Sequence, residues 1–123
     1  MHNRVFVYGT LKRGNRVRGM DRMGNAKFIN EAVTVDAEYS LYDLGAFPAV
    51  SRRGENRIQG EVWEVDDALM AILDVIEGYP DFYNRCEVVT TEGTAWMYYI
   101  DDVAAQCNCT QITGSKEKTL AWQ

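Results

Sequence analysis

Histidine, proline and cysteine are scarce in this 123-residue chain, which has one histidine, two prolines and three cysteines. The single histidine, His2, lies at the N-terminus, where chains tend to fray. A Ser-His-Asp or Cys-His relay needs a histidine that is held in place as the base. Hydrolysis by such a relay is therefore excluded.

The three cysteines are Cys86, Cys107 and Cys109. An odd number of cysteines, with no apolar signal segment after Met1, predicts reduced thiols and a cytoplasmic protein. A structural zinc site needs four ligands, and Cys107 and Cys109 are separated by only one residue, so we predict no metal site. No stretch reaches the roughly 18 to 20 apolar residues that cross a membrane, so we predict no membrane partner.

Positive charge is in the minority, with 13 Lys and Arg against 18 Asp and Glu and a formal net charge of -5. This balance disfavours attraction to nucleic acid. A local basic cluster is the exception, formed by Lys12, Arg13, Arg16, Arg18 and Arg22. An anion-binding surface on this cluster remains an alternative, and it predicts affinity that depends strongly on salt.

The length fits one compact domain over residues 1–123. With 46% hydrophobic residues, the chain has enough apolar side chains to bury a core. Runs of β-branched, aromatic and alternating residues predict strands at 4–8, at least two within 26–44, one at 58–65, and a hairpin of 83–90 and 94–100 around Glu92 and Gly93. Residues 15–24 favour a short helix or turn, Pro48 an edge or bend, and residues 51–57 a polar loop. We therefore predict a mixed α+β domain with a curved or closed sheet and one main helix.

That helix is predicted between Asp66, a good N-cap, and Gly78, a C-cap followed by Pro80. Apolar residues at helical spacing, namely Leu69, Ile72, Leu73 and Ile76, define its buried face. On this helix Glu77 borders the core, whereas Asp74 is expected to face water.

Glu77 is a candidate catalytic residue. The negative end of the helix dipole and partial burial among aromatic residues would both raise the pKa of its carboxyl group. A raised pKa suits a group that transfers protons. The alternative is an ordinary surface glutamate before a C-cap glycine.

The spacing of Gly9 and Gly14 after a strand is superficially that of a phosphate-binding P-loop. Asn15 and Arg16 stand where that motif needs lysine followed by serine or threonine. A P-loop is therefore excluded.

Several segments together resemble the γ-glutamylcyclotransferase-like family, and most closely its γ-glutamylamine cyclotransferase branch. In chain order they are Val5-Phe6-Val7-Tyr8-Gly9-Thr10-Leu11-Lys12-Arg13-Gly14, Phe47-Pro48-Ala49-Val50, Gly60-Glu61-Val62-Trp63-Glu64-Val65, Leu73-Asp74-x-x-Glu77-Gly78 and Tyr83-x-Arg85. The resemblance spans about residues 4–100, and the role of residues 101–123 is left open.

The resemblance implies a small mixed β-barrel in which the backbone of Tyr8, Gly9, Thr10 and Leu11 holds the substrate and Glu77 handles protons. It also implies that no metal and no organic cofactor are needed. In this family the α-amine of a γ-glutamyl group attacks its own side-chain amide, which releases 5-oxoproline and an amine. Tyr83 and Arg85 are candidates for shaping the pocket.

The same residues leave other interpretations open. A noncatalytic module that binds a small molecule or a protein on the same fold is the alternative to an enzyme. The amine attached to the γ-glutamyl group depends on loops such as residues 51–57, and the oligomeric state is also open.

Overall fold

The computed structural model describes residues 2–9, 11–13, 19–20, 26–102 and 109–122. Its elements, in chain order, are β1 (His2–Val7), β2 (Lys27–Val33), β3 (Tyr39–Asp43), β4 (Pro48–Asp66), α1 (Asp67–Glu77), β5 (Asn84–Thr90), β6 (Gly93–Tyr99), β7 (Thr110–Ile112) and β8 (Thr119–Leu120). The helix or turn expected over residues 15–24 falls mostly outside this description, which includes only Gly19 and Met20 of that segment.

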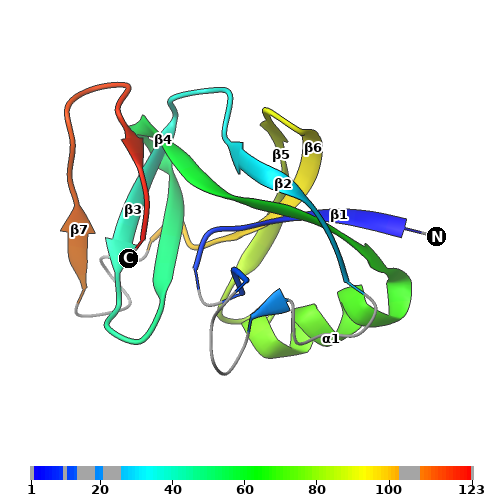
Figure 1. The fold of residues 1–123 in the computed structure, drawn as a ribbon. Helices are drawn as coiled ribbons and strands as arrows, with labels where there is room; N and C mark the ends of the chain where they lie inside the picture. The colour runs from blue at the N-terminus through cyan, green and yellow to red at the C-terminus, as the bar shows by residue number, and fades with distance from the viewer. Residues whose placement is uncertain (1, 10, 14–18, 21–25, 103–108, 123) are drawn as a thin grey trace.

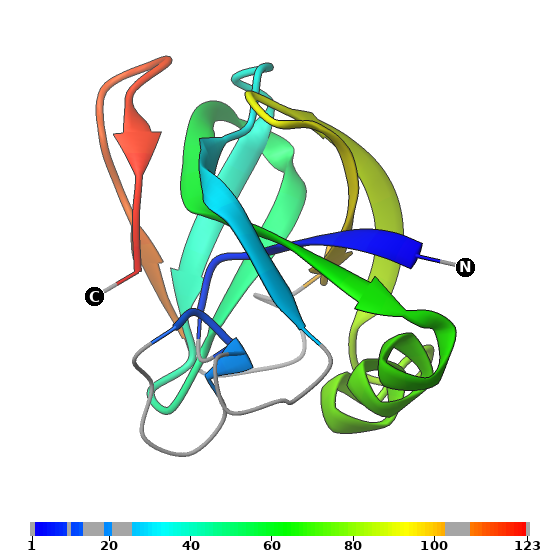
Figure 2. The same cartoon turned by 45° about the vertical axis from the view of Figure 1, so that its right-hand side comes forward.

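The strands form one mixed sheet in the order β5-β6-β1-β4-β3-β7, and β2 and β8 also pair with β4. Figure 1 shows α1 along one end of this sheet, and Figure 2, turned by 45°, shows β3 and β7 on the side away from the helix. The predicted α+β class is confirmed. Along the described strands the path runs from β5 to β7 without closing, so "barrel" describes this sheet only loosely.

The second half of strand β1 is buried on both faces. Val5 and Val7 pack into a cluster that includes the helix residue Leu73. Phe6 and Tyr8 point the other way, into a second cluster. Because side chains alternate along a strand, β1 joins the two halves of the core.

Strand β4 has 19 residues, and it includes residues 51–57, for which we predicted a loop. That prediction is wrong. The pairing with β3 passes from Ser40 opposite Ser51 to Tyr39 opposite Asn56, so residues 52–55 are an exposed bulge in a strand that continues on both sides. The polarity that suggested a loop belongs to this bulge.

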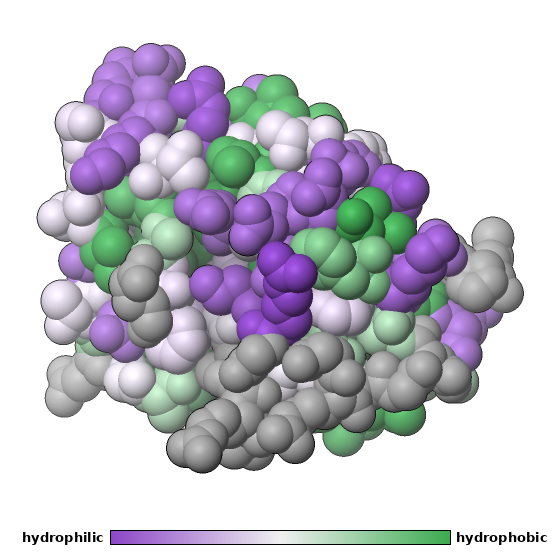
Figure 3. Space-filling model, in the orientation of Figure 1, coloured by the Kyte–Doolittle hydropathy of each residue, from purple (hydrophilic) through white to green (hydrophobic). Residues whose placement is uncertain are grey.

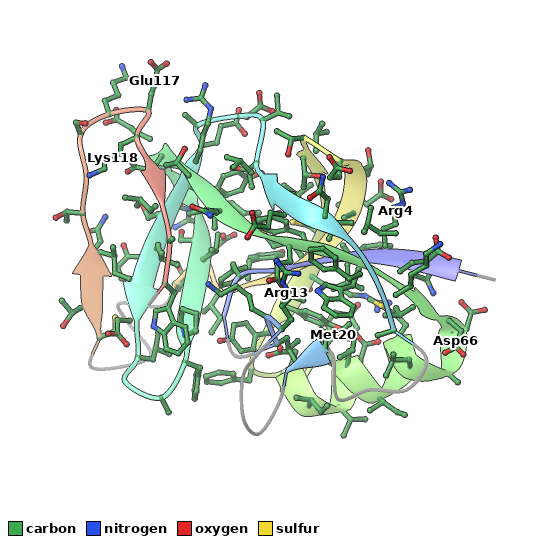
Figure 4. All side chains as sticks on the ribbon, viewed as in Figure 1. Arg4, Arg13, Met20, Asp66, Glu117 and Lys118 are labelled. Atoms are coloured by element: carbon green, nitrogen blue, oxygen red, sulfur yellow. The ribbon has the colours of Figure 1, made fainter. Side chains whose placement is uncertain are left out.

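The predicted helix boundaries are confirmed. The Asp66 side chain accepts a hydrogen bond from the Leu69 amide, and Figure 4 shows Asp66 where α1 begins. Gly78 ends the helix with φ of 66°, a left-handed conformation that glycine adopts without strain. The predicted buried face needs one correction, because Ile72 is 52% exposed and Met70 is buried in its place.

The β4 bulge is tied to the end of β6 by an ion pair between Arg52 and Asp101. Arg52 Nη2 lies 2.6 Å from Asp101 Oδ2, and the guanidinium group lies 4.1 Å from the centre of the Tyr99 ring. Hydrogen bonding from Arg52 lowers the pKa of Asp101 below its usual 3.8. A carboxyl group whose pKa is lowered by folding stabilises the fold above its unfolded pKa, and this contribution is lost as the pH falls through the lower folded pKa.

We therefore expect Asp101→Asn to lower the free energy of unfolding at pH 7, because it removes the ion pair. The loss should be only about 1 kcal/mol, since water screens the half-exposed Arg52. Below pH 3.8 the two proteins should converge in stability. Thermal unfolding of both proteins from pH 7 to pH 2.5 checks this. A difference that stays constant over this range would contradict it.

On the face seen in Figure 3, hydrophilic residues cover most of the upper part, and hydrophobic ones are interspersed among them. No helix within the described part of the chain has the length and apolar character that crossing a bilayer requires.

Candidate active site

A pocket of about 170 Å³ opens where β1 ends. Three segments meet there: the turn that follows β1, the turn between β3 and β4, and the end of α1 with the residues after it. The lining residues are Phe6, Val7, Tyr8, Gly9, Leu11, Phe47, Pro48, Ile76, Glu77, Phe82, Tyr83 and Tyr98. Of these, Glu77 is the one whose side chain has a carboxyl group.

Most of the predicted site residues line this pocket together. Glu77 is the last residue of α1, and Tyr8, Gly9, Leu11 and Tyr83 are also in the lining. The backbone carbonyl of Glu77 accepts a hydrogen bond from the Tyr83 amide, which fixes the chain just after the helix. Thr10, also predicted to hold substrate, lies outside the described residues.

The buried tyrosines of the pocket are held as neutral groups. Tyr8 donates a hydrogen bond to the Tyr98 carbonyl oxygen at 2.6 Å and accepts one from the Val50 amide at 3.1 Å. Burial raises the pKa of Tyr8 well above its usual value of 10.0, and burial likewise raises the pKa of Tyr98. Neither phenol can therefore accept a proton from substrate at neutral pH.

Gly9 and Pro48, which come from separate motifs of the sequence, meet at the wall of the pocket. A Cβ atom on Gly9 would lie 2.5 Å from Pro48 Cγ and 2.6 Å from Pro48 Cδ. Any other side chain at position 9 would force these two segments apart. Pro48 begins β4, the position where a strand tolerates proline best.

Aromatic side chains form another part of the lining. Tyr83 donates a hydrogen bond to the Pro48 carbonyl oxygen, which joins the segment after α1 to the start of β4. The rings of Phe47 and Phe82 meet edge to face, with centroids 5.9 Å apart. Phe82 is among the aromatic residues that the sequence placed around Glu77, whereas Tyr98 was missed because it reaches the site through the packing of a distant strand.

Arg85, the other candidate for the pocket, is not among the lining residues. Its Nη1 atom lies 2.9 Å from both carboxylate oxygens of Asp74, and its guanidinium group packs over the rings of Tyr79 and Trp96. Asp74 also accepts a hydrogen bond from the Tyr98 hydroxyl at 2.7 Å. Arg85 is thus connected to the pocket only through other side chains.

Asp74 was expected to face water, and this expectation is wrong. Its side chain is 22% exposed, because β5 and β6 bring Arg85 and Tyr98 against this side of α1. Within the described part of the chain, no group of three or more His, Cys, Asp and Glu side chains could hold a metal ion.

The family described as "Gamma-glutamyl cyclotransferase, AIG2-like" matches residues 5–119 of the sequence. Because the match spans nearly the whole chain, this chain belongs to that family. The match also extends past Ile100, where the motifs alone ended, and it reaches the last strand, β8.

Individual relatives are similar over most of their length. A Vibrio cholerae protein is 39% identical over 98 residues, which cover 80% of this chain and 82% of that protein. The gamma-glutamylcyclotransferase family protein YtfP of Escherichia coli K12 is 37% identical over 97 residues, or 77% of this chain and 80% of that protein.

Solved structures share the fold. A solution NMR structure of ytfP from Escherichia coli has a TM-score of 0.66 and 31% identity, covering 94% of each chain. The crystal structure of an AIG2-like protein from Mus musculus has a TM-score of 0.71 and 26% identity, covering 86% of this chain and 82% of that one.

Proposed function

We propose that this protein is a cyclotransferase that cleaves a γ-glutamyl amide by attack of the substrate's own α-amine, releasing 5-oxoproline and a free amine. Family membership supports γ-glutamylcyclotransferase activity in general. The observation that carries the specific proposal is that Glu77 lines one pocket with Tyr8, Gly9 and Leu11.

The reaction needs few protein groups, because the substrate supplies the nucleophile. Ring closure within one molecule is fast when the enzyme holds the folded conformer in which the amine lies beside the amide carbon. The pocket combines aromatic and aliphatic side chains with one carboxyl group, and it is suited to selecting that conformer. No covalent intermediate with the enzyme is required.

In this mechanism Glu77 transfers the protons. Its carboxylate takes a proton from the α-ammonium group, and the freed amine attacks the amide carbon to form the new C–N bond. A second proton leaves the same nitrogen as the ring becomes a lactam. The bond to the original amine breaks, and the leaving nitrogen receives both protons in turn through Glu77. The carboxylate is regenerated, and no net proton is consumed.

The turn after β1 has a binding role in the proposal. Backbone N–H groups of residues 8–11 can donate to the substrate's α-carboxylate or to the oxygen that becomes negative during attack. The Lys12 amide donates to the Gly9 carbonyl at 3.0 Å, so the turn is closed on itself before substrate binds. A cytoplasmic location for the reaction stays a prediction.

The direct test is incubation of the purified protein with γ-glutamyl amines, γ-glutamyl dipeptides and glutathione, with 5-oxoproline detected by mass. We expect release from one of these classes, which would also identify the amine. Absence of release from every class would contradict the proposal. Saturable binding of the same compounds without turnover would then favour the noncatalytic module.

A further inference from the structure

Glu61 is a buried carboxylate that the proposed mechanism does not use. It lies on β4, and only 7% of its surface is exposed. Burying a charge is costly unless it is paired and hydrogen-bonded. Its partners therefore indicate why a carboxylate is placed there.

Arg13 contacts Glu61 twice, through one backbone hydrogen bond and one ion pair. Glu61 Oε1 accepts from the Arg13 backbone N–H at 2.9 Å, and Glu61 Oε2 lies 3.3 Å from Arg13 Nε. The Trp63 indole N–H also donates to Glu61 Oε1, at 3.1 Å. Glu61 thus holds both the backbone and the side chain of Arg13.

Neighbouring strands hold the Arg13 side chain as well. Glu31 on β2 lies directly opposite Glu61, and two like charges in that position repel each other. Arg13 Nη2 lies 3.6 Å from Glu31 Oε1, so the guanidinium group lies between the two carboxylates. It also lies 4.1 Å from the centre of the Phe28 ring. Figure 4 shows Arg13 beside the crossing of β2 and β4.

Arg13 ends the turn whose earlier residues line the pocket. Gly9 and Leu11 are in the lining, and the Pro48 ring packs directly against Gly9. The Leu11 carbonyl is held by the Met20 amide at 2.8 Å. The contact of Arg13 with Glu61 therefore fixes the end of the described part of this turn against β4.

We propose that Glu61 is a positioning residue, which acts through Arg13 to hold the turn of residues 9–13 in the geometry that binds the substrate's α-carboxylate. This proposal rests on the proposed function, because it assigns the turn's ligand. It assigns specificity for the carboxylate to a side chain that does not itself line the pocket.

The test compares two substrates of the same amine, a γ-glutamyl amide and the corresponding 4-aminobutanoyl amide. The second lacks the α-carboxylate, and its ring closure gives 2-pyrrolidinone. For Glu61→Gln, which keeps the size but loses the charge, we expect kcat/KM for the γ-glutamyl amide to fall about 10- to 100-fold, mainly through KM. The value for the 4-aminobutanoyl amide should change little. The quantity compared between variants is the ratio of kcat/KM for the two substrates. If the 4-aminobutanoyl amide reacts too slowly, the ratio of the inhibition constants of 5-oxoproline and 2-pyrrolidinone takes its place.

Glu55→Gln is the matched control, since Glu55 is an exposed residue of the same strand and none of residues 51–57 is among those that line the pocket. Arg13→Met is the second variant, because it keeps the hydrogen bond from the backbone N–H of residue 13 to Glu61. It should shift the ratio of kcat/KM for the two substrates in the same direction as Glu61→Gln, but by less. Equal loss with both substrates would overturn the proposal and leave Glu61 a purely structural role. Absence of 5-oxoproline from wild type and Glu55→Gln alike would instead overturn the proposed function.

Discussion

Replacing Glu77 by glutamine is expected to lower the rate of 5-oxoproline release by about 100- to 10,000-fold, the usual contribution of a positioned acid-base group. Glutamine has nearly the same shape, but it cannot take the proton of the α-ammonium group. Tyr8 and Tyr98, two of the buried tyrosines that line the pocket, cannot replace Glu77, because burial raises the pKa of each. Release is measured by mass spectrometry, and substrate binding by calorimetry should persist.

Two further variants sharpen this test. Glu77→Asp should also be slow, since the shorter side chain withdraws the carboxylate from the reacting nitrogen. Glu38→Gln makes the same chemical change at an exposed position before β3 and should retain full activity. Undiminished release by Glu77→Gln would remove Glu77 from the mechanism.

Leu73→Ala is expected to lower the free energy of unfolding by about 2–5 kcal/mol. Leu73 is fully buried in the cluster that joins α1 to β1, so the truncation leaves a cavity between the two elements that carry the site. Chemical denaturation of both proteins measures the difference.

Val75→Ala is the matched control for this variant. Val75 lies on the same helix but is 80% exposed, so its truncation should change stability by less than about 0.5 kcal/mol. If both variants lost the same stability, core packing at Leu73 would not be the cause, because alanine favours the helix at both positions.

The parts of the fold that the sequence predicted well are those with local signals. Asp66 and Gly78 bound the helix through hydrogen bonds to their own neighbours, so the residue types are sufficient evidence. The hairpin of β5 and β6 turns at Gly93, whose φ of 95° favours glycine. In both cases the signal and the structure involve the same few residues.

The errors came from contacts between distant segments. Residues 52–55 are as polar as a loop, and only the pairing of their flanks with β3 makes them part of a strand. Ile72 fits the apolar spacing of the helix, yet the sheet covers Met70 in its place. Tertiary packing decides such cases, and a periodic pattern does not contain that information.

The candidate site shows the same division. The sequence singled out Glu77, Gly9 and Tyr83, and the fold brings them to one pocket. The sequence could not show that Arg85 lies outside the pocket, because Arg85 pairs with Asp74 and this pair joins strand β5 to helix α1. The sequence pattern placed Tyr98 in a strand. It could not show that the Tyr98 hydroxyl contacts Asp74 on the helix, because this contact depends on how β6 packs against α1.

The length of β4 has a consequence for how the chain could be divided. This one strand pairs with β1, β2, β3 and β8, which come from both ends of the sequence. A cut in the paired part of it would leave each fragment with unsatisfied strand edges and half a core. The protein should therefore resist conversion into complementing fragments, whereas inserted peptides should be tolerated in its turns and in the exposed bulge of residues 52–55.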